Sequence, residues 1–242
     1  MNPLITVCAK ANSEGLPGKN IRLLNGKPLI VWTVEQAKRW NRGEIVISTD
    51  SIDIANWDLG VEKIYYPNER AKELGIHQDD TPKVRVVREV LKYMESIAYV
   101  LFDPIIDLDV TNPCRTVGDI GNAYNLWLKT KPSTLFSVTP ARKNPYFNQV
   151  EYLNSDCLGT AKQGRYFRRQ DAPLIWDMNC SIYIYSRGFL LMGDDRVIQP
   201  DSVLYEMEPW QAYDIDNEID FQIVECLTEK RGKCLGLTAR QP

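Results

Sequence analysis

The feature that most constrains this chain is a regular alternation of short apolar runs with amphipathic segments. Five runs bounded by turn-forming residues have the composition of buried strands: 3–8, 44–50, 61–66, 104–110 and 134–139. The segments between them carry apolar residues at helical spacing: 28–40, 51–60, 81–97 and 116–130. This alternation predicts an α/β fold, with a mainly parallel sheet and helices on both of its faces.

The pattern changes after about residue 141. Segments 144–153, 164–170 and 177–186 are rich in β-forming residues and are joined by short polar turns, which predicts an inserted β-rich arm. A helix then follows Asn217, its expected cap, with Ile219, Ile223 and Leu227 expected to face inward. We therefore expect four parts: a nucleotide-binding α/β part (1–140), the arm (141–180), completion of the α/β domain (181–230) and a C-terminal tail (231–242).

Composition excludes several classes of protein. The 242 residues carry a net charge of −3 without a basic block, which argues against partners such as nucleic acid or an anionic membrane. No apolar run approaches the length of a membrane-spanning helix, and the N-terminus lacks the pattern of a signal peptide, so we expect a cytoplasmic protein.

The reactive residue types narrow the chemistry further. His77 is the only histidine, which excludes Ser-His-Asp, Cys-His and multi-histidine metal sites. The six cysteines form no CxxC pair and are expected to be reduced thiols. Catalysis must then use carboxylates, lysine, arginine, hydroxyls or a metal bound by oxygen.

In an open α/β sheet, ligands bind beyond the carboxyl ends of the strands. Four polar segments follow predicted strands and are expected to meet there: 8–20, 48–50, 108–115 and 213–218. Within the last of these, Asp214 and Asp216 would face the same way in extended chain, and such a pair suits Mg²⁺. The alternative is a solvated acidic turn that caps the last helix.

The segment 8–20, CAKANSEGLPGKN, follows the first strand and holds small residues and two lysines, Lys10 and Lys19. Its backbone amides could cradle phosphate, although it matches neither standard phosphate-loop pattern and could be an ordinary turn. Glu14 lies in its middle, where a cradle for an anion would not favour a carboxylate.

Polar residues of the arm are the last candidates. Arg165, Arg168 and Arg169 could bind carboxylates or phosphates, or could pair with nearby aspartates on a solvated surface. Asn179, Ser181 and Tyr183 alternate along one segment, so they are expected to share one strand face, lining a sugar site or meeting solvent. His77 fits a loop position better than a catalytic one.

Several of these segments, in this order, resemble the acylneuraminate cytidylyltransferases, the enzymes that make CMP-sialic acid and CMP-legionaminic acid. The segments are AKANSEGLPGKN, NGKPLIVWT, STDSIDIA, LDVTNPCRTVGDI, SVTPARKNPYFNQVE, RRQDAP, DMNCSIYIY and AYDIDNEIDF. The resemblance spans about residues 4 to 228 and implies a Rossmann-like sheet of the nucleotide-diphospho-sugar transferase type. It also implies that the arm forms a homodimer and reaches into the neighbouring site.

The resemblance implies roles for individual residues. The nucleotide CTP would be bound by Ala9, Lys10, Ala11, Asn12, Ser13, Gly15, Lys19 and Asn20, with Arg70 near the cytosine. Catalysis would rest on Lys19 with Asp214 and Asp216, which would hold Mg²⁺. The acceptor sugar would meet Asp109, Arg169, Gln170, Asn179 and Tyr183.

Three departures from the family pattern affect this interpretation. Lys10 replaces an arginine, and Glu14 replaces a lysine. At an effective dielectric near 20, a charge about 4 Å away contributes roughly 4 kcal/mol, so Glu14 aimed at the phosphates would oppose binding. Asp109 replaces a glutamine that faces the sugar, which favours a legionaminic-type acceptor.

The sequence thus predicts a cytidylyltransferase that joins CTP to a 2-keto-3-deoxy-nonulosonic acid and releases pyrophosphate. Three alternatives stay open. They are a Kdo-type acceptor, another nucleoside triphosphate, and a catalytically inactive nucleotide- or sugar-binding relative.

Overall fold

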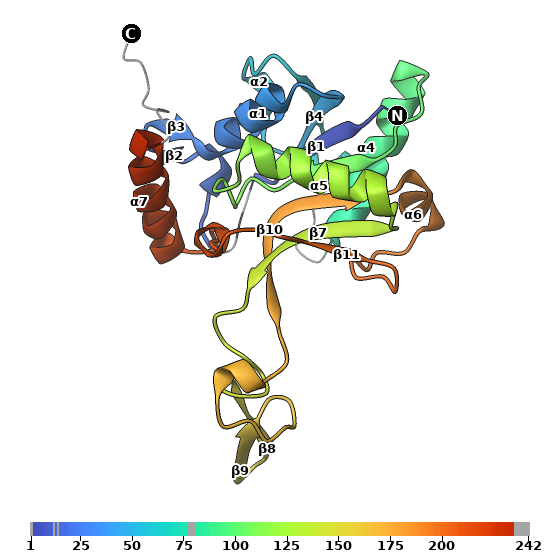
Figure 1. The fold of residues 1–242 in the computed structure, drawn as a ribbon. Coiled ribbons are helices and arrows are strands. Elements are labelled where there is room, and N and C mark those ends of the chain that lie inside the picture. The colour runs from blue at the N-terminus through green and yellow to red at the C-terminus, as the bar shows by residue number, and fades with distance from the viewer. Residues whose placement is uncertain (1, 12, 14, 77–80, 235–242) are drawn as a thin grey trace.

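A seven-stranded mixed sheet forms the centre of the molecule (Figure 1). The structure, a computed structural model, describes residues 2–11, 13, 15–76 and 81–234, and for residues 68 and 230–234 the backbone alone. The strand order is β11-β7-β10-β6-β1-β4-β5, and β10 runs antiparallel to both of its neighbours while the other pairs are parallel. The strands are β1 (Leu4–Ala9), β4 (Glu44–Thr49), β5 (Glu62–Tyr65), β6 (Ile105–Leu108), β7 (Thr134–Pro140), β10 (Trp176–Tyr185) and β11 (Val203–Glu206).

Helices cover both faces of the sheet, as predicted, because neighbouring strand residues point to opposite sides. Leu4 and Ile105 pack on one face, with α3 (Asn68–Leu74), α4 (Lys83–Ala98) and α6 (Arg187–Met192). The other face, which includes Ile5 and Val7, is covered by α1 (Leu29–Trp40), α2 (Ile52–Asn56), α5 (Val117–Thr130) and α7 (Glu218–Cys234). The α/β architecture is confirmed.

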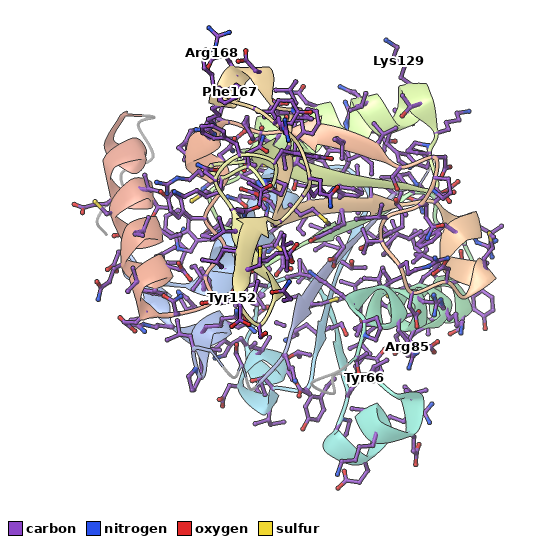
Figure 2. All side chains as sticks on the ribbon, turned by 90° about the horizontal axis from the view of Figure 1, so that it is seen from below. Tyr66, Arg85, Lys129, Tyr152, Phe167 and Arg168 are labelled. Atoms are coloured by element: carbon purple, nitrogen blue, oxygen red, sulfur yellow. The ribbon has the colours of Figure 1, made fainter. Side chains whose placement is uncertain are left out.

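The predicted arm is also present. The chain leaves the sheet after β7 and returns through β10, and between them lie the hairpin β8 (Val150–Asn154) and β9 (Cys157–Thr160) and the short helix η2 (Arg169–Asp171). Figure 1 shows this arm projecting well away from the rest of the chain. Figure 2 looks at it from below, with Tyr152 on the hairpin and Phe167 and Arg168 at its outer edge.

Smaller elements complete the fold. The short helix η1 (Lys19–Ile21) and the two-residue strands β2 (Leu23–Leu24) and β3 (Lys27–Pro28) follow β1, and η3 (Pro209–Gln211) precedes α7. None of the helices in the described part of the chain is long and apolar enough to cross a membrane.

Two local expectations were wrong. The helix expected over 51–60 ends at Asn56, although its Ser51 cap is confirmed by the bond that Ile54 N donates to Ser51 Oγ. In α7, the Asn217 cap is confirmed, since its side-chain oxygen accepts bonds from the amides of Ile219 and Asp220. However, Ile219 is 68% exposed.

Candidate active site

The carboxyl ends of β1 and β4 hold the first predicted loop in place. Thr49 Oγ1 donates to the carbonyl oxygen of Ala9 at 2.6 Å, and the amide of Ala11 donates to Asp50 Oδ1 at 2.6 Å. Asn20 is buried and donates through Nδ2 to the carbonyl oxygen of Lys10 at 2.8 Å. Ala9, Lys10, Ala11 and Asn20 therefore belong to one fixed loop.

This loop borders a hollow of about 370 Å³. Its lining includes Lys10, Ala11 and Asn20 from the loop, together with Asp50 and Asp53. Arg70 lies in α3, pairs with Glu73 at 2.9 Å and lines a second hollow of about 440 Å³. Tyr65 lines both hollows, so Arg70 flanks the loop region rather than joining it.

Lys19 joins the loop to the distant DID segment, residues 214–216. Its Nζ donates to the carbonyl oxygen of Ile215 at 2.7 Å and lies 3.4 Å from Asp216 Oδ1. Gly15 touches the same segment, because a Cβ built on it would lie 2.2 Å from the carbonyl oxygen of Asp216. Two of the predicted segments, 196 residues apart in sequence at Lys19 and Ile215, thus form one site.

The predicted loop residues Asn12 and Glu14, and the only histidine, His77, lie outside the described residues. Ser13 is described and half-buried.

The two carboxylates of the DID segment occupy different surroundings. Ile215 is buried and anchors the segment through its amide, which donates to the carbonyl oxygen of Thr111. Asp216 is 73% exposed. Burial, together with the nearby Asp109 carboxylate and to a lesser extent the Asp216 carboxylate, raises the pKa of Asp214 to about 6.

A divalent cation fits this pair. Asp214 Oδ1 is buried, and no protein group donates a hydrogen bond to it. In the described part of the chain no group of three or more His, Cys, Asp or Glu side chains could hold a metal ion. Two carboxylates with positions left for phosphate and water are what Mg²⁺ usually takes, whereas a closed protein cage suits other ions.

Asp109 lies beside this pair and is held by a lysine that the sequence analysis missed. Lys83 Nζ lies 2.7 Å from Asp107 Oδ2 and 2.5 Å from Asp109 Oδ2. Burial lowers the pKa of Lys83, but the two carboxylates more than offset this and raise it well above its usual value. Burial likewise raises the pKa of Asp109, and Lys83 reverses the effect, so that this pKa is lowered.

A signal for this lysine was present in the sequence. Asp107 and Asp109 alternate along a strand whose other residues are apolar, so both carboxylates had to lie at one buried face and required a cation. Asp107 is fully buried and also accepts a bond from Thr6 Oγ1 at 2.8 Å.

Asn179 and Tyr183 do not share one face, contrary to expectation. The pairing of β10 with β7 shifts register between Met178 and Tyr183. Asn179 is buried against η3, where its Nδ2 donates to the carbonyl oxygen of Gln211, and its oxygen accepts a bond from Ser137 Oγ. Tyr183 lies on the opposite side, where Lys83 Nζ is 5.6 Å from its ring centre.

The arm holds the remaining predicted residues. Arg169 donates through Nη2 to the carbonyl oxygen of Ala141 at 2.6 Å, and Gln170 is exposed beside it. Arg168 pairs with Asp171 at 2.9 Å. For Arg168 this agrees with the alternative that the arginines of the arm pair with nearby aspartates on a solvated surface. These residues lie in or next to η2, which belongs to the projecting arm (Figure 1).

The comparisons with known proteins identify the chain as a nucleotidyltransferase. Residues 4–235 match the family model described as Cytidylyltransferase, and the chain belongs to this family. It is 39% identical to the CMP-N,N'-diacetyllegionaminic acid synthase of Campylobacter jejuni, over 93% of this chain and 94% of that protein. It is 37% identical to the post-translational flagellin modification protein B of Campylobacter coli, over 94% of this chain and 95% of that protein.

A more distant relative and a solved structure are also similar to this chain. The N-acylneuraminate cytidylyltransferase A of Danio rerio is 29% identical over 90% of this chain and 49% of its own length. CMP:2-keto-3-deoxy-manno-octonic acid synthetase, solved in complex with CTP, is similar in fold, with a TM-score of 0.67 and 16% identity over 96% of this chain and all of that one.

Proposed function

We propose that this protein transfers CMP from CTP to a 2-keto-3-deoxy-nonulosonic acid of the legionaminic or sialic type and releases pyrophosphate. The observation that carries the proposal is the contact of Lys19 with the DID segment, because it brings a cation, a loop of backbone amides and two carboxylates to one place. The similarity to a CMP-N,N'-diacetyllegionaminic acid synthase over nearly the whole chain supports this acceptor class.

The reaction takes place at a triphosphate, whose negative charge the site has to neutralise. The anomeric hydroxyl of the acceptor attacks the α-phosphorus and releases its proton to solvent, and the bond from that phosphorus to the bridging oxygen of pyrophosphate breaks. Lys19 and the loop amides face the negative charge that develops on the leaving group, and holding the reactants in line supplies much of the rate. Mg²⁺, held by Asp214 and Asp216, would neutralise phosphate charge.

The acceptor side is expected to use Asp109 and Tyr183. Lys83 keeps the Asp109 carboxylate ionised and fixed, so that it can accept hydrogen bonds from hydroxyl or amide groups of a sugar. A legionaminic-type acid offers amide donors, and Kdo does not.

The arm would complete the site from a second copy of the chain. Its hairpin exposes Val150, Tyr152 and Leu158 at 69%, 72% and 60%, and apolar side chains exposed together can mark an interaction surface. A homodimer that covers this surface would also bring Arg169 and Gln170 to the site of its partner. Because CTP is a cytoplasmic metabolite, we place the reaction in the cytoplasm.

The test is release of pyrophosphate by purified protein with Mg²⁺. Four nucleoside triphosphates are assayed against sialic, legionaminic, pseudaminic and Kdo acids. We expect turnover with CTP and a nonulosonic acid, and a fall of roughly a hundredfold or more in Asp216→Asn. Asp58→Asn, a change at an exposed carboxylate outside the site, should leave turnover unchanged.

Each other result has a definite meaning. Turnover with Kdo alone would replace the acceptor class, and turnover with another triphosphate would replace the nucleotide. No pyrophosphate release in the whole array would overturn the proposal in favour of an inactive binding protein.

A further inference from the structure

The side chain of Arg22 joins the chain just after η1 to the start of α7. Its Nη1 donates to Glu218 Oε2 at 2.5 Å and its Nη2 donates to Glu218 Oε1 at 2.7 Å, so both oxygens of the carboxylate are bound. The Arg22 Cζ lies 4.0 Å from the centre of the buried Phe221 ring. The guanidinium is therefore held by two residues of one helical turn, Glu218 and Phe221.

The backbone of Arg22 is also fixed. Its amide donates to the carbonyl oxygen of Lys19 at 3.2 Å. Its carbonyl oxygen accepts a bond from the amide of Leu29, the first residue of α1, at 2.9 Å. Arg22 is therefore attached directly to Lys19, the residue that contacts the DID segment.

The first turn of α7 holds the DID segment at the other end of this link. The amides of Asp216 and Asn217 both donate to Asp220 Oδ2 at 3.1 Å. The amide of Phe221 donates to the carbonyl oxygen of Asn217 at 3.1 Å. A movement of Glu218 or Phe221 would therefore displace Asp216 as well.

Exposed ion pairs usually add little to stability, and the Arg22 and Glu218 side chains are 37% and 51% exposed. This pair differs from most in its two parallel hydrogen bonds and in the ring beneath the guanidinium, both of which fix its geometry. It also joins the same two segments that Lys19 and Ile215 join. We therefore expect its effect on the relative position of the two segments rather than on the free energy of unfolding.

We propose that Arg22 is a positioning residue, whose bonds to Glu218 keep Lys19 in place relative to the DID segment while Lys19 binds the phosphates. This rests on the proposed function, since it assigns Lys19 to the phosphates. Lys19 Nζ must offer hydrogen bonds to the nucleotide, so its own bond to Ile215 is not a sufficient link between the segments. Arg22 can maintain the link throughout, because the partner of its guanidinium belongs to the protein.

Removal of Glu218 separates this inference from a direct effect of charge. Glu218 is an anion near the site, so charge alone would make Glu218→Ala bind CTP more tightly and Arg22→Ala less tightly. If the two side chains act as a pair, both variants lose the same contact and both bind CTP more weakly. CTP affinity is measured by isothermal titration calorimetry with Mg²⁺ on the two single variants and on the double variant.

Hydrogen exchange on the nucleotide-free protein gives a second readout that needs no ligand. Peptides covering 15–24 and 213–221 are followed by mass spectrometry, because local opening between the two segments speeds the exchange of their amides. Lys27→Ala is the matched control. Lys27 Nζ pairs with Glu35 at 2.7 Å and lies 4.7 Å from the centre of the Trp32 ring, so it makes the same kinds of contact with partners in α1 instead of α7.

We expect Arg22→Ala and Glu218→Ala each to weaken CTP binding about tenfold. The double variant should lose about the same tenfold rather than roughly a hundredfold, because effects within one pair do not add. Exchange should be faster by about threefold or more in both segments. Lys27→Ala should change neither quantity. Glu218→Gln, which removes the charge and keeps the shape, should also weaken binding, and it replaces Glu218→Ala if alanine lowers the unfolding temperature.

Three results would overturn the inference. They are CTP binding by Glu218→Ala that equals or exceeds that of the wild type, losses that multiply in the double variant, and wild-type exchange rates in both single variants. Failure of the proposed function would look different. Exchange would still respond to loss of Arg22 or Glu218, while the wild type would bind no CTP or would release no pyrophosphate with any acceptor.

Discussion

At the scale of single residues, the site depends on close approaches that leave no room for an extra atom. Gly15 lies against the carbonyl oxygen of Asp216, and a methyl group there would meet backbone that cannot move aside without displacing the DID segment. Although Gly15 is exposed, its lack of a side chain is a requirement of the site rather than of the core.

Gly15→Ala should therefore damage activity more than stability. A displacement of about 1 Å between the loop and the carboxylates can lower kcat/KM roughly a hundredfold. Pyrophosphate release and thermal unfolding measure the two effects. Gly188→Ala is the control, because a Cβ there meets nothing within 4 Å in α6 and should leave kcat/KM unchanged. Full activity in Gly15→Ala would mean that activity does not depend on the close contact between the loop and the DID segment.

Loss of Lys83 should cost considerable stability. Lys83→Met would leave the buried carboxylates of Asp107 and Asp109 without their cation, and breaking such a pair costs about 3–5 kcal/mol. Urea unfolding at pH 7 measures this loss. Lys92→Met, in an exposed pair with Glu89 on the same helix, should change the free energy of unfolding by less than about 0.5 kcal/mol.

The pH dependence follows from the direction of each pKa shift. The raised pKa of Lys83 gives stability that is present at neutral pH and is lost only as pH rises through that raised value. The lowered pKa of Asp109 gives stability that is present above its ordinary value and is lost as pH falls through the lowered one. The deficit of Lys83→Met should therefore shrink as pH falls, because without Lys83 burial alone acts on Asp109 and its carboxylate takes up a proton more readily than in the wild type. A deficit that is constant from pH 7 to pH 3 would contradict the ion-pair account.

At the scale of elements, hydrophobic periodicity predicted the strands and helices that bury one continuous face. It did not predict β11, a short edge strand in which Leu204 remains 39% exposed, because an edge strand needs little apolar pattern. In α7 the apolar residues form two sets at helical spacing, and either set could have faced the core. The structure buries Phe221 and Val224 instead of Ile219, and the Arg22 guanidinium lies 4.0 Å from the centre of the Phe221 ring.

The candidate site also contains residues that the sequence predicted and residues that it did not. The acidic pair and the loop were predicted because both are polar segments at the carboxyl ends of strands, where α/β sheets bind ligands. Lys83 is 24 residues before Asp107 and lies in a helix, so only the packing of α4 on β6 joins them. The register shift at Cys180 is set by contacts with the loop after β6, which a strand-like pattern does not encode.

The capping box of α5 is an element whose stability can be tested alone. The Asp119 amide donates to Thr116 Oγ1 at 3.1 Å, and the Thr116 amide donates to Asp119 Oδ2 at 2.7 Å. Thr116→Ala should lower the free energy of unfolding by about 1 kcal/mol, and by up to about 2, as measured in urea. Thr130→Ala at the other end of the helix has no such role and should have less effect. Equal losses at the two ends would argue against the cap.

At the scale of the whole molecule, two features of the arm motivate the proposed homodimer. A two-stranded hairpin has little stability by itself. β8 and β9 form a separate two-stranded sheet and pair with no strand of the main sheet. Arg169 and Gln170 lie in η2, and the arm that holds η2 projects away from the rest of the chain (Figure 1). A dimer would explain both features, because a symmetric pair buries the two arms and places each at the site of the other subunit.

Mixed dimers test this arrangement directly. Arg169→Ala and Asp216→Asn are first shown to be inactive as homodimers, and the two chains are then co-expressed with different tags so that only heterodimers are purified. If each arm serves the other subunit, one site of the heterodimer combines an intact arm with an intact DID segment, and the other carries both defects. We expect about half of the wild-type turnover per dimer, because two-fold symmetry gives two equivalent sites.

The control heterodimer pairs Asp214→Asn with Asp216→Asn. Both changes lie in the same segment, so each site keeps one defect and no activity should return. An inactive Arg169→Ala/Asp216→Asn heterodimer would show instead that each arm serves its own chain. A monomeric mass for the wild type, measured by analytical ultracentrifugation, would contradict the dimer itself. Recovery of activity in the first pair and none in the second can arise only if the site is shared between subunits, because neither chain then holds every group that the reaction needs.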